Sequence, residues 1–127
     1  NPKFSAVCRD VITHGYRDAT DILGIPLGES WSTDERFHST WTFRYDGGDE
    51  IFIDGRKGRL LAQHPGVLIV SNVPSSTGWA AGVWTYAIQF SMQRVVASEV
   101  NAYGGLELPI KGVRARSINL SCRFEFR

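Results

Sequence analysis

Long apolar runs are absent from this 127-residue sequence, and none approaches the roughly 18 residues that a membrane-spanning helix needs. An excess of one charge is lacking too, because 14 basic and 13 acidic residues leave a formal net charge of +1. Such a balance does not steer a protein toward nucleic acid or an anionic membrane. Catalytic signatures are also missing: there is no G-x-S-x-G, no H-E-x-x-H and no phosphate-binding loop. We therefore expect no membrane span and no nucleic-acid partner.

What is present resembles an ordinary globular domain, with 43% hydrophobic and 21% charged residues. At this length we expect one domain, residues 1–127, that buries about two-thirds of the surface of its unfolded chain. No signal peptide is visible, and the first residue is Asn1 rather than methionine. This start fits a processed mature chain or a trimmed one, and processing would fit secretion.

The clearest local pattern is a β-hairpin over residues 38–54. Residues 38–46 alternate, so that Trp41, Phe43 and Tyr45 point to one face and polar residues point to the other. A period of two is the signature of a half-buried strand. The turn that follows contains two consecutive glycines, which supply the positive φ that tight hairpin loops need.

The register of this hairpin follows from its apolar face. A three-residue loop, 47–49, places Phe43 opposite Ile53 and Tyr45 opposite Ile51, so one face is wholly apolar. A two-residue loop would turn both isoleucines to the polar face. Because a slip of one residue moves every side chain to the wrong side, the buried face selects the three-residue loop.

Further segments of strand length indicate an all-β protein. They are residues 4–12, 59–63, 67–73, 83–92 and 113–127, with 94–100 favoured as a strand over a helix and 106–110 as a short addition. Residues 13–29 are expected to be irregular, and residues 55–58 to form a turn. About eight or nine short strands with little or no helix predict a single-domain antiparallel β-sandwich, jelly-roll-like or a flattened barrel.

The two cysteines, Cys8 and Cys122, both fall on inward faces of the first and last predicted strands. A disulfide between them requires Cα atoms within about 7 Å and would fit an oxidising, secreted or cell-surface setting. The alternative is two free buried thiols that behave as small hydrophobic groups. Two cysteines cannot form a zinc site without histidines, and His14, His38 and His64 show no ligand spacing.

Two of the four tryptophans, Trp31 and Trp79, fall in predicted loops and are candidate ligand-binding residues. A flat ring offers stacking area to a sugar or peptide, and nearby Ser30, Ser76 and Thr77 offer hydroxyl groups. The alternative is that these rings plug the ends of the sandwich.

The acidic hairpin turn is a second candidate site, because Asp46, Asp49 and Glu50 offer the hard oxygen ligands that Ca²⁺ prefers. The spacing does not match an EF-hand, and no other cofactor is indicated. A solvated turn with neighbouring bases that offset its charge is the alternative. The candidate bases are Arg44, Arg56 and Lys57.

The last predicted strand carries two further features. Asn119 begins an N-x-S glycosylation sequon and faces outward by parity. Arg114 and Arg116 extend the apolar face, where a charge needs a partner. Pairing with Glu99 or Glu107, or contact with a partner subunit in a homo-oligomer, would supply one.

Together these patterns favour a non-catalytic, lectin-like binding module, secreted or on the cell surface. We expect it to recognise a glycan or a protein surface through loops at one end of the sandwich. The alternative is a self-assembling structural subunit of a capsid, envelope or appendage. A second alternative is a small hydrolase that uses a histidine and a carboxylate, although no catalytic residue can be named.

Overall fold

The computed structural model describes residues 2–20, 26–33, 40–73, 83–100 and 112–127. These residues form a single sheet of nine antiparallel strands and contain no helix, which confirms the all-β prediction. The described residues therefore include no helix that is long and apolar enough to cross a membrane. The strands are β1 (Phe4–Thr20), β2 (Pro26–Thr33), β3 (Thr40–Tyr45), β4 (Glu50–Ile53), β5 (Arg56–His64), β6 (Val67–Ser71), β7 (Val83–Gln89), β8 (Arg94–Val100) and β9 (Gly112–Phe126).

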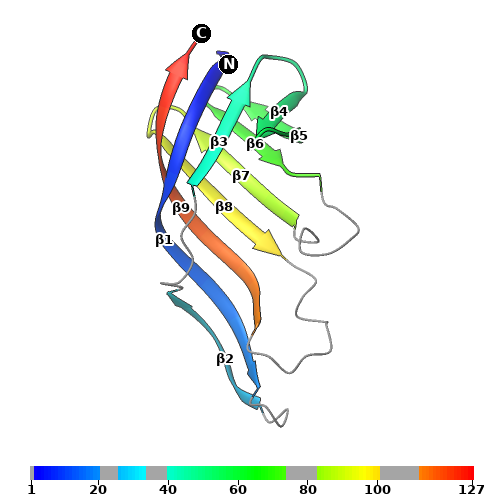
Figure 1. Ribbon diagram of the computed structural model, residues 1–127, viewed down its shortest axis with the longest axis vertical. Coiled ribbons are helices and arrows are strands. Elements are labelled where there is room, and N and C mark those ends of the chain that lie inside the picture. Colours follow the sequence, from blue (N-terminus) through cyan, green and yellow to red (C-terminus); the bar gives the residue numbers. More distant parts are fainter. Residues whose placement is uncertain (1, 21–25, 34–39, 74–82, 101–111) are drawn as a thin grey trace.

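The sheet closes on itself as the flattened barrel that the sequence predicts. From β3 to β9 each strand pairs with the next, β9 pairs with β1, and β1 pairs with β3. Strand β2 stands outside this ring and pairs with the second half of β1. Figure 1 shows the result: a barrel from which β1 and β9 continue, together with β2, as an arm.

A bulge in β1 marks where the arm leaves the barrel. Asp10 pairs with Leu120 but Ile12 pairs with Asn119, so Val11 is an extra residue in β1. Beyond this point the partner of β1 changes from β3 to β2. The expectation of an irregular segment over residues 13–29 is therefore wrong for its described parts. An extra residue bends the strand and changes which alternate residues face the core. The period of two is therefore interrupted in the sequence at this point.

The barrel core consists of alternate residues from all eight ring strands except β5, whose inward positions are filled by a buried glycine and a half-buried leucine. The buried apolar side chains are Phe4, Ala6, Cys8, Phe43, Tyr45, Ile51, Ile53, Leu68, Val70, Tyr86, Ile88, Val95, Ala97, Ile118, Leu120 and Cys122. Gly58 on β5 has no space for a side chain, since a Cβ there would lie 2.7 Å from the Ser71 carbonyl oxygen. Close packing against β6 thus requires a glycine at this position.

The register of the β3–β4 hairpin is the predicted one. Phe43 lies opposite Ile53, and both side chains are buried. The loop is held by Gly47 and Gly48, whose φ values are 92° and 79°. The Tyr45 hydroxyl donates a hydrogen bond to the Gly48 carbonyl at 3.0 Å, which ties the turn to the end of β3.

The next turn differs from the prediction, because it lies at Asp54–Gly55 rather than at residues 55–58. Both residues have positive φ, 51° and 77°. This geometry is typical of the two-residue Asp-Gly hairpin loop, in which both central residues are left-handed. Strand β5 accordingly begins at Arg56, three residues earlier than the predicted start at Arg59.

The predicted disulfide is present between Cys8 and Cys122, and the described residues include no free cysteine. The strand over residues 94–100 is also confirmed, as β8. Met92, the last residue of the strand predicted over residues 83–92, is instead 65% exposed in the turn between β7 and β8. A four-residue loop, 90–93, with Gln93 at φ 51°, ends the alternation that the sequence seemed to continue.

Candidate functional site at the tryptophan end of the barrel

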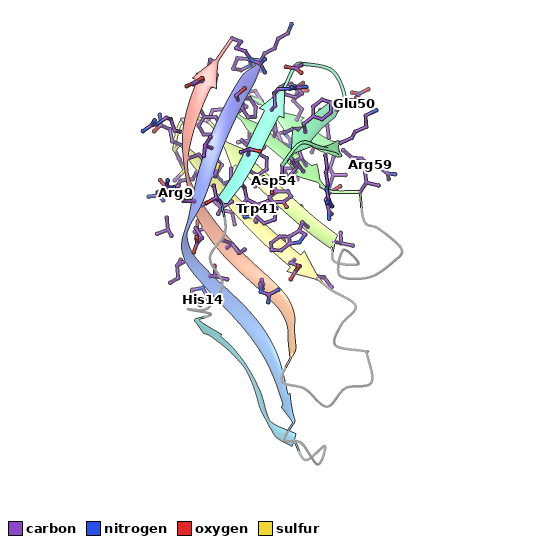
Figure 2. The ribbon with its side chains drawn as sticks, in the orientation of Figure 1. Arg9, His14, Trp41, Glu50, Asp54 and Arg59 are labelled. Carbon is purple, nitrogen blue, oxygen red and sulfur yellow. A yellow bond between two sulfur atoms is a disulfide. The ribbon has the colours of Figure 1, made fainter. Side chains whose placement is uncertain are left out.

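One end of the barrel gathers the side chains with the most binding chemistry. We call it the tryptophan end and define it by Trp41, Trp84, Glu99 and Arg116. Trp41 and Trp84 are second residues of β3 and β7, and Glu99 is the last but one of β8. Trp41 is labelled in Figure 2.

An aromatic cluster lines the tryptophan end from the inside. The rings of Trp41 and Trp84 lie 5.1 Å apart, and Trp84 stacks on Tyr86 at 6.1 Å with an interplanar angle of 13°. Tyr86 in turn meets the ring of Phe43 edge-on at 5.2 Å. Tyr86 and Phe43 are buried, whereas both tryptophans are half-buried. The cluster therefore anchors two partly accessible indole rings on the core.

The phenol of Tyr86 is held in its neutral form. Burial raises the pKa of Tyr86, and the negative charges of Asp54 and Glu99 raise this pKa further. A phenol that stays protonated keeps its O–H as a hydrogen-bond donor. The aromatic cluster therefore contains a neutral polar group, the Tyr86 hydroxyl, rather than an anion in addition to Glu99.

Next to the aromatic cluster lies an ion pair between Glu99 and Arg116. These residues face each other across β8 and β9, and Arg116 Nη1 lies 2.7 Å from Glu99 Oε1. Their side chains are only 10% and 22% exposed. Glu99 is one of the two acidic partners expected for Arg116, and this pair is present; the other, Glu107, lies outside the described residues. A paired carboxylate and guanidinium therefore lie beside the indole rings, with Glu99 directly opposite Trp84 on the neighbouring strand.

Three hydrogen bonds hold the strand backbones at this end of the barrel. The side-chain oxygen of Asn72 accepts a hydrogen bond from the backbone N–H of Trp84 at 2.9 Å. The backbone N–H of Asn72 donates to the backbone carbonyl of Trp84 at 3.2 Å. Asp54 accepts from the Thr42 N–H at 2.7 Å. These bonds hold the backbone of Trp84 and of Thr42, the residue that follows Trp41 in β3.

The predicted binding residues are distributed differently from the expectation. Trp79, Ser76 and Thr77 lie outside the described residues, in the segment that joins β6 to the start of β7. Ser30 and Trp31 lie in β2, opposite Arg17 and Tyr16, and not in a loop. In the sheet order, β1 lies between β2, which carries Trp31, and β9, which carries Arg116 of the tryptophan end.

Trp41 and Trp84 are binding candidates that the sequence did not suggest, since their alternation with apolar residues assigned both to the core. They do pack against the core, but they remain partly exposed. The position of Trp84 directly after a predicted loop was the available signal. A ring at the first inward position of a strand is covered on one side only.

The acidic turn lies at the opposite end of the barrel, near both termini, and is rich in ion pairs. Asp46 pairs with Arg44 at 3.1 Å and with Arg127 at 2.7 Å, and Glu50 pairs with Lys57 at 3.0 Å. These contacts supply the offsetting charge that the turn needs. No group of three or more potential ligands among histidine, cysteine, aspartate and glutamate is found in the described part of the chain. Calcium at this turn stays a prediction, and a Ca²⁺ ion would compete with these bases.

The other candidate residues lie apart from the tryptophan end. Asn119 is exposed on the outer wall, between Ile12 of β1 and Val96 of β8. His14 lies on β1 beyond the bulge, His64 ends β5 at the opposite end of the barrel, and His38 lies outside the described residues. Glycosylation and hydrolysis both stay predictions.

Comparison with known proteins yields no relative: no protein-family model, no curated protein and no solved structure matches the chain. The class of the protein therefore rests on its fold, an antiparallel closed β-sheet with a disulfide between its first and last strands. Any function has to be argued from the residues themselves.

Proposed function

We propose that this protein is a non-catalytic, lectin-like module that binds a glycan at the tryptophan end of the barrel. One observation carries the proposal: the two half-buried indole rings, 5.1 Å apart, beside the largely buried Glu99–Arg116 pair. An exposed indole face suits the apolar face of a sugar ring. A carboxylate accepts hydrogen bonds from sugar hydroxyls and a guanidinium donates them. Apolar stacking with a few oriented polar groups is the usual composition of a small-ligand site.

The setting that we propose is secretion or the cell surface. The Cys8–Cys122 disulfide is compatible with an oxidising compartment, where such bonds persist. Glycans on other molecules are accessible in the same compartment. The proposal of a glycan ligand and the proposal of this location thus support each other.

A glycan array probed with the labelled protein tests the proposal, followed by titration of the best ligand with intrinsic tryptophan fluorescence. A Trp84→Phe variant keeps an apolar ring but reduces stacking area, so affinity should fall about three- to tenfold. A Met92→Ala variant is the matched control, because Met92 is an exposed apolar residue at the opposite end of the barrel. It should bind like the wild type. Absence of any glycan bound above background, or an equal loss in both variants, would contradict the proposal.

Trp79→Ala extends the test to the segment outside the described residues. If Trp79 contributes to the same site, its removal should abolish binding and leave thermal stability nearly unchanged. A loss of about 3–5 kcal/mol in stability would instead indicate a buried ring. That outcome would restrict the proposed site to Trp41 and Trp84.

A self-assembling structural subunit is the second candidate, and the arm favours it. In the described part of the sheet β2 is an end strand that pairs only with β1. An edge strand offers backbone groups for pairing with another chain. Light scattering over a hundredfold concentration range decides this point, because assembly through β2 should increase the mass with concentration. A constant monomeric mass would exclude assembly under those conditions.

A further inference from the structure

The outer wall of the barrel carries a cluster of arginines on three neighbouring strands. Arg9 of β1 and Arg94 of β8 both lie opposite Ser121 of β9, so the three residues form one row across the sheet. Arg123 lies two residues further along β9 and is therefore on the same face as Ser121. Arg9 and Arg123 are diagonal neighbours, with backbones roughly 7–8 Å apart in such a ladder.

These guanidinium groups lack internal partners. In the described ranges, the side chains of Arg9, Arg94 and Arg123 take part in no ion pair or hydrogen bond, unlike those of Arg44, Arg116 and Arg127. Arg9 and Arg123 are both exposed, so their N–H donors are available to an external anion.

The wall is hollowed at this cluster. A shallow depression is lined by Val7, Arg9, Ser121, Arg123 and Glu125, together with Cys122. Val7 is 51% exposed and supplies an apolar floor. The Ser121 hydroxyl and the Glu125 carboxylate complete a mixed lining, in which Glu125 also has no described ion-pair partner.

We propose that this hollow binds a sulfated sugar of a glycan chain, with the sulfate held between Arg9 and Arg123 and the sugar hydroxyls donating to Glu125. Planar guanidinium groups bind tetrahedral oxyanions through paired N–H donors. Val7 contacts the apolar face of the sugar ring. The site is distinct from the tryptophan end and does not depend on the function proposed there.

Glu125 distinguishes a sulfated sugar from a nucleic acid. The phosphate backbone of duplex DNA presents acceptors and negative charge but no hydrogen-bond donor, so a carboxylate in the hollow would only repel it. A sugar carries both an anionic group for the arginines and hydroxyl donors for the carboxylate. The formal net charge of +1 also gives no general attraction to nucleic acid.

The test measures binding of a fluorescent heparin tetrasaccharide by anisotropy in 50 mM NaCl. The double variant R9Q/R123Q should lose at least about tenfold in affinity, because two charge-assisted contacts disappear. The control is R56Q/R59Q, which removes the same charge from exposed positions of β5. Figure 2 labels Arg9 and Arg59 on opposite sides of the barrel. The control should stay within about twofold of the wild type, the size of a weak long-range effect.

Three results would overturn the proposal. The first is no binding by the wild type, and the second is an equal loss in R9Q/R123Q and R56Q/R59Q, which would show that only net charge matters. The third comes from E125Q: the tetrasaccharide should bind this variant more weakly, whereas a 12-base-pair DNA duplex should bind it more tightly. If both probes gain affinity in E125Q, the carboxylate merely repels anions and the hollow is not a sugar site. Circular dichroism should show that all variants, which change exposed residues, remain folded.

Discussion

Cys8 and Cys122 lie directly opposite each other on β1 and β9, with Cα atoms 4.0 Å apart and their sulfur atoms bonded. The bond joins residues that are 114 positions apart in the sequence. It crosses the seam at which the first and last strands close the barrel, just before the bulge at Val11. The disulfide therefore fixes the pairing of the first and last strands, which are far apart in the sequence.

Removing this bond should lower the stability of the barrel strongly. In the chain-entropy description, a loop of this length contributes about 4–5 kcal/mol by restricting the unfolded chain. We expect the C8A/C122A double variant to unfold at a clearly lower temperature, measured by circular dichroism. Reductant should shift the melting temperature of the wild type but not that of the double variant. Two free thiols in the air-exposed wild type, found by mass spectrometry, would contradict the expectation.

Gly58→Ala should destabilise the protein by about 1–3 kcal/mol, the usual range for overpacking. The new Cβ would lie 2.7 Å from the Ser71 carbonyl oxygen and 2.8 Å from Ile53 Cδ1. Chemical denaturation measures the change. Ile53→Val removes the second of these contacts, so the double variant should lose less stability than the sum of the two single variants. Strict additivity would show that Ile53 is not part of the clash.

Asp54→Ala should cost about 1–2 kcal/mol, because alanine is strained at a positive φ and cannot accept the bond from the Thr42 N–H. Asp54→Asn is the matched control. Asparagine tolerates the left-handed conformation and keeps a carbonyl acceptor, so its stability should stay close to that of the wild type. Equal losses in both variants would indicate that the negative charge, not the geometry, matters at this turn.

Glu99→Gln should destabilise the barrel by about 1–3 kcal/mol, because it leaves the charge of Arg116 in a largely buried position without its carboxylate. Glu50→Gln removes the same charge from an ion pair with Lys57 whose side chains are more than half exposed. Such surface pairs contribute little, so its effect should stay below about 1 kcal/mol. Similar effects in the two variants would show that burial does not strengthen the Glu99–Arg116 pair.

Stability should fall at alkaline pH through Tyr86. The folded pKa of this phenol is raised by burial above its unfolded value near 10, so the unfolded state loses the proton first. Stability attributable to Tyr86 is thus fully present below about pH 10 and declines above it, by about 1.4 kcal/mol at pH 11. Tyr86→Phe should make the decline between pH 9.5 and 11 shallower in urea titrations. An unchanged slope would show that Tyr86 ionises in the folded protein.

Local alternation was sufficient to predict most of the barrel. The register Phe43–Ile53 follows from sidedness alone, because only one loop length places Ile51 and Ile53 on the same face as Phe43 and Tyr45. The disulfide required only that Cys8 and Cys122 both face inward from strands that pair in the folded chain. Both predictions rely on side chains that alternate between the two faces of a strand. They therefore hold wherever the strand has no bulge.

The remaining features depend on irregular positions and on contacts between distant segments. The extra residue Val11 reverses the inward parity of β1, so its second half looked irregular in the sequence. Arg127 as a partner of Asp46 could not be anticipated, because no local pattern places the last residue beside the hairpin turn. The tryptophan end required knowing that Trp41 and Trp84 start strands at the same end of a closed sheet.

The seam between β1 and β9 also determines how the protein responds to mechanical force. Both ends of the chain leave the barrel from the same side, so a pull on them opens the seam one residue pair at a time from Phe4 and Phe126. The peeling stops at the disulfide, after the pair formed by Val7 and Arg123. Tension then passes from one end of the chain to the other through the sulfur atoms. The barrel between them bears no load until the bond is reduced.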